Sequence, residues 1–311
     1  MNISHLKYIV EVEKAGSISK AAENLYMGQP NLSKAIKELE QTLNIAIFRR
    51  TSKGTELTHK GREFLGYAKN ILKQYEEMEA LGSEQEQFRQ ELRISVPRAS
   101  YVVSSFTDFI LTLDMDKPLH ADFFETNALR AIRNVADGLS DFGIIRCREE
   151  YQEYFHSMLK GYSLDWRDIL HFSYQLIMQQ NHPLATLEVI PYAALQPYIE
   201  IIHGDTNMQH TSSERVETER GHTPGDKKIY VYERGSQFDL LSRVSQTYMW
   251  VSPMPQDLLD RNGLVQRSCE ESPAFKDILI FSHRHRFTSL EKKFLAQVER
   301  MAKIITAGHA E

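Results

Sequence analysis

Apolar residues recur at helical spacing through the first 44 residues and divide this stretch into three short helices. Leu6, Ile9 and Val10 follow the i, i+3, i+4 pattern of a first helix, which ends at Gly16. The next two helices show the same pattern at Ile18, Ala21, Ala22 and Leu25, and at Leu32, Ile36, Leu39 and Leu43. Only a turn at residues 26–28 separates these two helices, so the spacing predicts a helix-turn-helix.

The third of these helices carries a polar face that is not made of Glu/Lys pairs. Its outward residues are Gln29, Asn31, Ser33, Lys34 and Lys37. Glutamine and asparagine can each donate to and accept from adenine, and serine and lysine suit bases or phosphates. A proline in the first turn, Pro30, costs the helix little. Taken alone, the pattern also fits the solvated face of a plain helical hairpin.

Two short apolar segments with a basic turn between them follow the third helix. Residues 45–48 and 55–58 read as strands, and the turn holds Arg49, Arg50 and Lys53. A hairpin of this kind is typical of a wing, whose basic side chains suit phosphates or a minor groove. With the wing included, the sequence favours a DNA-binding surface over a merely solvated one.

A long helix is expected from about residue 59 to 87, with Thr58 as its cap. Its apolar residues recur mainly by sevens, at Phe64, Leu65, Ala68, Ile71, Leu72, Tyr75 and Met78. A lone helix with such a stripe is marginal in water, so pairing with a second copy explains the stripe economically. Packing of the stripe on its own chain is the alternative.

From about residue 92, strands alternate with helices. Residues 91–96, 119–125 and 141–145 read as strands with helices between them, which predicts a parallel sheet with ligand-binding loops at the strands' carboxyl ends. A second set begins near Ile169 and includes a strand expected at residues 191–195. A helix from Ser289 to about Thr306 closes the chain. The almost wholly polar stretch 203–228 is expected to form a loose helix or a mobile flap.

Composition and charge refine this picture. The chain has 311 residues, of which 41% are hydrophobic and 25% charged, which fits a globular protein of two or three domains. Residues 1–62 carry a net charge of +4 and the whole chain carries −5, so the remainder carries −9. A basic module on an acidic body suggests a polyanion partner for the first part.

The sequence also indicates in which compartment the protein resides. We expect no signal peptide and no membrane span, and therefore a cytoplasmic protein. Cys147 and Cys269 fit no zinc or CxxC spacing, and two free thiols in a reducing compartment are favoured over a redox pair.

At this point the sequence resembles the LysR-type transcriptional regulators. The likeness spans about sixty positions and continues more faintly through Leu92–Ile94 and through Asn181–Ala185. The matching residues are Leu6, Gly16, Ser17, Ala21, Ala22, Leu25, Gln29, Pro30, Ser33, Ile36, Leu39, Glu40, Leu43, Phe48, Arg49, Arg50, Leu57, Thr58 and Gly61. Two departures stand out: Gly28 replaces a usual serine, and residues 247–253 are bulkier than the family's glycine-rich strand entry. The second means either a reshaped inducer pocket or a shifted register.

The resemblance implies an α+α/β architecture in three parts. These are a winged helix-turn-helix DNA-binding domain at 1–58, a dimerising linker helix at 59–88 and an effector-binding domain at 89–311. The last has two α/β lobes like those of periplasmic binding proteins, lobe I at about 91–165 and 270–311 and lobe II at about 166–269. Double-stranded promoter DNA would contact Ser17, Gln29, Pro30, Asn31, Ser33, Lys34, Lys37, Arg49, Arg50 and Lys53. The chain would associate as a dimer or tetramer.

A small inducer would bind between the lobes, where four loops converge. The expected residues are Arg98, Ser100, Tyr101, Thr126, Asn127, Arg146, Ile202, His203 and Phe238. Ser100 could seat an anion at its helix N-terminus, with Arg98, Arg146 and Arg148 completing a carboxylate site. Nearby aromatic residues suit an aromatic inducer instead. A plain helix cap for Ser100 and solvated surface for the arginines remain alternatives.

No catalytic pattern accompanies these features. The chain has no GxSxG, HExxH or phosphate-binding loop, and the alternating segment 283–286 fits a solvated strand end or subunit contact better than a metal site. We therefore expect no cofactor, no metal and no enzymatic activity. The competing hypothesis is a solute-binding or enzymatic α/β protein whose helical N-terminus mediates oligomerisation only.

Overall fold

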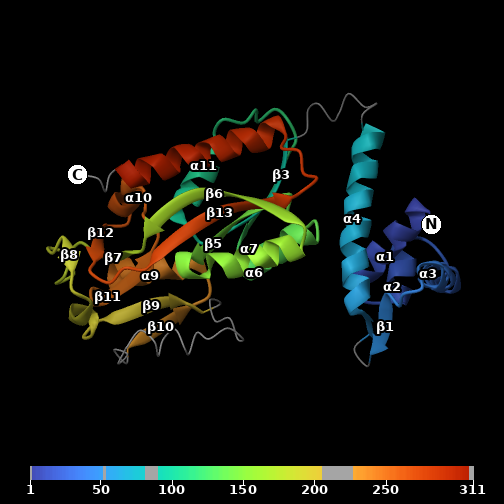
Figure 1. Ribbon diagram of the computed structural model, residues 1–311, viewed down its shortest axis with the longest axis horizontal. Helices are drawn as coiled ribbons and strands as arrows, with labels where there is room; N and C mark the ends of the chain where they lie inside the picture. The colour runs from blue at the N-terminus through green and yellow to red at the C-terminus, as the bar shows by residue number, and fades with distance from the viewer. Residues whose placement is uncertain (1, 52–53, 81–89, 205–226, 308–311) are drawn as a thin grey trace.

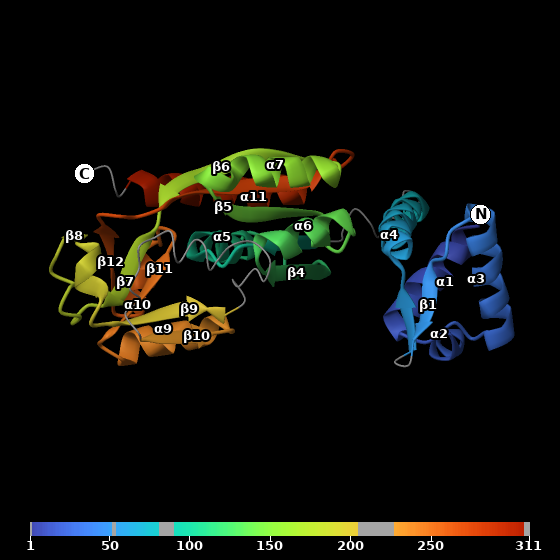
Figure 2. The same ribbon diagram turned by 60° about the horizontal axis from the view of Figure 1, so that its bottom comes forward.

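The computed structural model of the chain describes residues 2–51, 54–80, 90–204 and 227–307. Three parts are visible in Figures 1 and 2: a small helical module with a hairpin, the long helix α4, and a body with two β-sheets. Within the described residues, no helix is both long and apolar enough to cross a lipid bilayer.

The N-terminal module contains the three predicted helices followed by a hairpin. Their bounds are α1 Ile3–Ala15, α2 Ile18–Asn24, α3 Gln29–Leu43, β1 Phe48–Thr51 and β2 Gly54–Leu57. The apolar faces meet in one core that includes Ile9, Ala21, Leu32 and Ile36. Gly16 ends α1 in the left-handed conformation with φ 66°, where glycine carries no steric penalty. The helix-turn-helix prediction is confirmed.

The hairpin begins later than expected, at Phe48 rather than Ile45. The reason is a contact with α3: the Ile47 and Phe48 amides donate to Glu40 Oε1 at 2.7 and 3.0 Å. These bonds satisfy backbone groups that would otherwise pair in a longer ladder. Glu40 therefore fixes the hairpin to the third helix.

The long helix α4 spans His59–Ala80, and the part of the expected helix beyond residue 80 lies outside the described residues. The predicted cap is confirmed, because Thr58 Oγ1 accepts from the Gly61 amide at 2.9 Å. Gly61 is required by a close approach: a Cβ there would lie 2.0 Å from the Ile47 carbonyl oxygen. The first turn of α4 is thus packed directly against the residue that leads into the wing.

Lobe I of the body is a five-stranded sheet in the order β4-β3-β5-β13-β6. Its strands are β3 Gln90–Val96, β4 Leu119–Glu125, β5 Phe142–Arg148, β6 Leu164–Ser173 and β13 Ala274–Ser282. The first three pair in parallel, as predicted, and β13 runs antiparallel to both β5 and β6. Helices pack on both faces, which agrees with the nearly continuous burial along β5, since parallel strands covered on both faces do not alternate.

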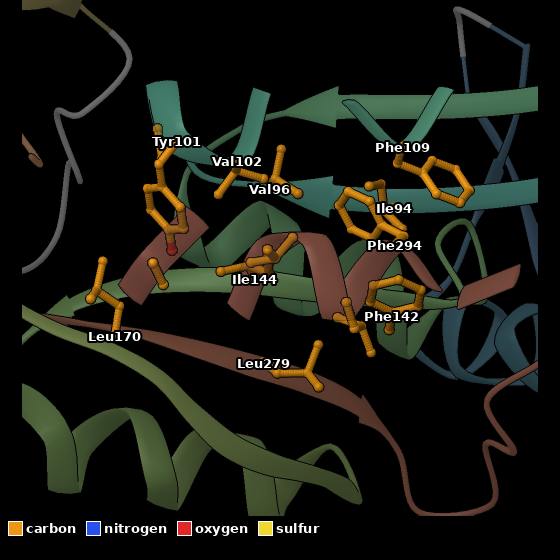
Figure 3. Packing of buried hydrophobic residues seen from close by; sticks show 14 of the residues in the cluster. Ile94, Val96, Tyr101, Val102, Phe109, Phe142, Ile144, Leu170, Leu279 and Phe294 are labelled. Atoms are coloured by element: carbon orange, nitrogen blue, oxygen red, sulfur yellow. The ribbon is translucent and has the colours of Figure 1, made fainter. Parts of the chain in front are cut away.

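One face of this sheet is covered by α5 (Ser100–Ile110) and α11 (Ser289–Ala307), and the other by α6 (Ala128–Ala136) and α7 (Gln152–Gly161). Figure 3 shows the first of these two cores, in which Phe109 and Phe142 pack around Phe294. The Tyr101 hydroxyl points into the same region.

Lobe II is a six-stranded sheet in the order β10-β9-β11-β7-β12-β8. Its strands are β7 Gln175–Gln179, β8 Val189–Ile190, β9 Ile199–His203, β10 Lys228–Val231, β11 Thr247–Val251 and β12 Leu264–Cys269. Helices α9 (Arg234–Arg243) and α10 (Gln256–Arg261) pack against it. The chain therefore crosses from lobe I to lobe II between β6 and β7 and returns between β12 and β13.

Two expectations about the body are wrong, and a third lies mostly outside the described residues. The strand Leu164–Ser173 belongs to lobe I, so the crossing lies after Ser173 and not near residue 166, because the apolar run at 169–172 continues the first sheet. The strand expected at 191–195 is wrong: Tyr192–Leu195 is a single 3₁₀ turn, which Pro191 starts. The expected flap at 203–228 falls mostly outside the described residues.

Candidate nucleic-acid interface and effector site

Helix α3 presents the predicted polar face. Leu32, Ile36 and Leu39 are buried in the module's core, whereas Gln29, Pro30, Asn31, Lys34 and Lys37 are exposed and Ser33 is half-buried. Gly28 occupies the N-cap position and supplies no side-chain cap. The Gly28 carbonyl oxygen accepts from the Asn31 and Leu32 amides at 3.0 and 3.2 Å, and Pro30 has no amide hydrogen, so the backbone itself satisfies most donors of the first turn.

The wing stands next to this helix. Strands β1 and β2 pair antiparallel with Arg49 opposite Glu56, and the Arg49 guanidinium lies 3.1 Å from the Glu56 carboxylate. The Arg49 side chain is 65% exposed, so this surface pair holds it only weakly. The side chain of Arg50 and the whole of Lys53 lie outside the described part of the chain.

The wing is also attached to the turn between α1 and α2. The Thr55 amide donates to the Gly16 carbonyl oxygen at 3.1 Å, and a Cβ on Gly54 would lie 2.8 Å from the same oxygen. Ser17 follows in that turn, half-buried, at the N-cap position of α2 without making a side-chain cap. The hairpin, this turn and α3 therefore form a single surface.

The apolar stripe of α4 divides between two faces. Leu65, Ala68 and Leu72 are buried within the chain's own module, and Ala68 and Leu72 pack with Leu6 of α1. Ile71 and Met78 are 37% and 64% exposed. Packing on its own chain thus accounts for part of the stripe, while Phe64 and Tyr75 are half-buried. Sequence reasoning missed Tyr67, which is exposed on the same helix one turn before Ile71.

In the body, Ser100 and Asn127 begin two helices at the carboxyl ends of β3 and β4. Asn127 caps α6, since its Oδ1 accepts from the Arg130 amide at 2.9 Å. The buried Thr126 donates its amide to the Val96 carbonyl at 2.8 Å. Ser100 is the first residue of α5 rather than its cap, and its hydroxyl accepts from Arg234 Nη2 at 2.8 Å. The capping alternative for Ser100 is therefore wrong.

Arg146 is not a free cation. Its Nε and Nη2 donate to the two oxygens of Asp277 at 2.8 and 2.7 Å, and the Tyr101 hydroxyl donates to Asp277 Oδ2 at 2.8 Å. Burial by itself lowers the pKa of Arg146, but the facing carboxylate outweighs burial and raises that pKa above its ordinary value. Burial, followed by the Asp277 charge, raises the pKa of Tyr101 as well. Arg146 and Tyr101 thus form a closed, satisfied cluster.

The other expected effector residues are spread around this cluster. Arg98 is half-buried in the loop before α5, and Arg148 pairs with Glu150 at 2.6 Å. Ile202 and His203 end β9, and the Phe238 ring on α9 lies 6.0 Å from the Arg234 guanidinium carbon. Ser100 and Phe238 therefore meet through Arg234, a residue that sequence reasoning missed.

Arg234 is the first residue of α9 in lobe II, and it bonds to both Glu125 and Ser100 of lobe I. These two bonds bring the start of α9 to the end of β4 and the first turn of α5. One sequence feature could have identified Arg234: it lies at the start of a helix that follows a strand, where ligand-binding groups gather in α/β sheets.

The two cysteines lie apart in different sheets. Cys147 belongs to β5 and Cys269 ends β12, and both are buried. Burial raises the pKa of the Cys147 thiol to about 11 and also raises that of Cys269. A buried thiol with a raised pKa is a poor nucleophile, which agrees with two structural cysteines and not with a redox pair.

Comparisons with known proteins agree with this geometry. Residues 3–62 match the sequence model described as the bacterial regulatory helix-turn-helix protein, lysR family. Residues 3–62 of the chain are therefore identified as a LysR-type helix-turn-helix module. Among curated relatives, YnfL of Escherichia coli, an uncharacterized HTH-type transcriptional regulator, is 27% identical over 205 residues, which cover 64% of this chain and 66% of YnfL.

TfdT of Cupriavidus pinatubonensis, an HTH-type transcriptional regulator, is 40% identical over 72 residues, or 23% of this chain and 32% of TfdT. The matches thus span less than two thirds of these relatives. Two solved structures share the fold over nearly the whole chain. ArgP from Mycobacterium tuberculosis has a TM-score of 0.66 at 15% identity and 96% coverage of both chains. A full-length OxyR variant from Pseudomonas aeruginosa has a TM-score of 0.63 at 16% identity and 98% coverage of both.

Proposed function

We propose that this LysR-type chain is a sequence-specific, DNA-binding transcriptional regulator that responds to a small molecule bound between its two lobes. Residues 1–58 would bind promoter DNA, 59–88 would link and dimerise, and 89–311 would bind the effector. The observation that carries the proposal is the exposed polar face of α3 next to the Arg49 wing, on a buried apolar face that fixes its orientation.

The contacts on DNA would divide between bases and phosphates. Gln29, Asn31 and Ser33 lie on the first turns of α3, the part of a recognition helix that meets base edges in the major groove. Lys34 and Lys37 lie further along, and the wing adds Arg49 and Arg50. Such a set of cations releases counterions when it binds, so affinity should fall steeply as salt rises.

Self-association would use the exposed side of α4. Tyr67, Ile71 and Met78 are exposed large apolar residues on one helix, spaced by four and seven positions, and a second copy is the economical way to cover them. An α/β solute-binding protein or enzyme that uses its helical N-terminus only to oligomerise would also account for this stripe, but it would leave the polar face of α3 without a purpose. The names of the matched relatives are those of transcriptional regulators.

The experiment compares two double variants in a gel-shift assay with DNA from upstream of the gene. Arg49→Ala/Arg50→Ala should weaken binding at least about tenfold and reduce the slope of log affinity against log salt by about two, one unit for each arginine withdrawn from a phosphate. Arg284→Ala/Arg286→Ala removes the same charge from exposed positions in lobe I and should bind as the unmodified chain does. Equal affinities of the two variants would contradict the assigned wing.

A further inference from the structure

Arg234 joins the two lobes through a largely hidden ion pair. Its Nη1 donates to Glu125 Oε1 and its Nη2 donates to Ser100 Oγ at 2.8 Å. Glu125 ends β4 and Ser100 begins α5, so both partners belong to lobe I, whereas Arg234 belongs to lobe II. The side chains of Arg234 and Glu125 are only 16% and 23% exposed. Charges withdrawn from water to this extent are costly unless each keeps a partner.

A ligand that enters between the lobes at this point must separate the pair and replace each partner. An anion would satisfy Arg234 but would place a second negative charge beside Glu125. A cation would satisfy Glu125 and leave the guanidinium unpaired. Since a largely buried charge that is left unpaired costs more than the new contact gains, the pair selects against ligands of a single charge. A small molecule that carries both charges meets both requirements.

The surroundings indicate which charge goes where. Ser100 starts α5, and Ala99 at the N-cap position makes no side-chain cap, so a carboxylate is favoured beside Ser100 and Arg234. Gln237 follows Arg234 by one turn on α9 and is 4% exposed, and its Oε1 finds no donor among the described residues. An ammonium next to Glu125 would supply a donor on the same helix face.

We propose that the Arg234–Glu125 pair recognises the effector and that the effector is a small zwitterion, an α-amino acid or close analogue. Its carboxylate takes the place of Glu125 against Arg234 and Ser100, and its ammonium takes the place of Arg234 against Glu125. The inference rests on the proposed function, in which a small molecule binds between the lobes. The inference adds the chemical class of the ligand and the residues that bind its two charges.

The first test measures the melting temperature of the full chain with each standard L-α-amino acid, followed by calorimetric titration of the best one. Its N-acetyl derivative, which keeps only the negative charge, and its carboxamide, which keeps only the positive charge, are titrated in parallel. Each derivative should bind at least about tenfold more weakly than the parent amino acid, a factor equivalent to about 1.4 kcal/mol. No binding by any amino acid, or equal binding by a derivative, would overturn the proposal.

The second test separates the two charges by mutation. Arg234→Gln should weaken binding of the amino acid at least about tenfold, and Glu125→Gln should remove the preference for the amino acid over its N-acetyl derivative. Arg300→Gln and Glu299→Gln, taken from the exposed pairs with Asp108 and Arg167, are the matched controls and should bind as the unmodified chain does. If a variant at the junction does not fold, the derivatives of the first test decide alone.

A gel shift with the unmodified chain keeps the two proposals distinguishable. DNA binding without any amino-acid binding would overturn this inference and leave the proposed function intact. Amino-acid binding without DNA binding would do the reverse.

Discussion

At the residue scale, His182 is a buried histidine whose surroundings disfavour its charged form. It is 2% exposed, its Nδ1 accepts from the Leu184 amide at 3.1 Å, and its ring lies 4.4 Å from that of Tyr198. Its Nε2 has no partner among the described residues. Burial lowers the pKa of His182, because the charged imidazolium would lose its hydration in this buried position.

This lowered pKa makes the folded chain less stable in mild acid. Below about pH 6.5, the ordinary value for histidine, the unfolded chain takes up a proton that the folded chain resists, so stability falls as pH falls. The melting temperature should therefore drop between pH 7.5 and 5.5, and His182→Asn should reduce the size of that drop. His59→Asn, at an exposed position, is the control and should keep it. Equal drops in His182→Asn and the unmodified chain would refute the assignment.

At the scale of elements, the wing depends on α3 as much as on its own strands. Glu40 receives two backbone amides from the segment that leads into β1, so the hairpin and the recognition helix are held by one carboxylate. A two-stranded hairpin alone is marginally stable, and this attachment supplies what its few ladder bonds cannot. We therefore expect Glu40 to act on DNA binding by positioning the wing.

Replacing Glu40 by alanine should accordingly weaken DNA binding without removing any side chain that faces the duplex. Loss of the acceptor leaves two amides without their partner, and the wing loses its fixed position. Glu63→Ala is the matched control, because it removes the same charge from an exposed position on α4. Fluorescence anisotropy with labelled promoter DNA should show lower affinity for Glu40→Ala than for Glu63→Ala. The same affinity for both would mean that Glu40 does not position the wing.

The same scale shows why parts of the fold were predictable. Residues close in sequence determine the three helices, the Thr58 cap and the parallel order of β3, β4 and β5. The local sequence pattern therefore predicts these features. The lobe boundary was misplaced because the apolar run at 169–172 suits either sheet. Arg234 was missed because its partner Ser100 is 134 residues away, and no local pattern records that pairing. Arg146 looked available for the corresponding reason, since Asp277 is 131 residues distant.

At the scale of the whole molecule, the Arg146–Asp277 pair lies beneath the two crossings between the lobes. The Arg146 guanidinium carbon lies 4.7 Å from the Phe172 ring and 5.8 Å from the Tyr174 ring. Tyr174, between β6 and β7, stacks on Phe275 of β13 with ring centroids 4.0 Å apart. One buried ion pair thus supports both connecting segments.

Asp277→Asn should therefore destabilise the body strongly. Asp277 is fully buried and the Arg146 side chain is 11% exposed, so removing one charge strands the other, at a cost of about 3–5 kcal/mol. Urea unfolding followed by fluorescence of Trp166 in lobe I and Trp250 in lobe II measures the change. Asp108→Asn, from an exposed pair with Arg300, should change stability by less than about 1 kcal/mol. Equal stabilities of the two variants would show that the buried pair is dispensable.

The close approach between Gly61 and the Ile47 carbonyl has a mechanical consequence. Because the two backbones touch with no side chain between them, we expect α4 and the wing to move as one unit. A helix of 22 residues is about 33 Å long, so tilting it by about 10° carries its far end through about 6 Å, close to two base-pair steps along a duplex. In a dimer paired through α4, as proposed above, a tilt of this size would change the spacing of the two wings along the operator.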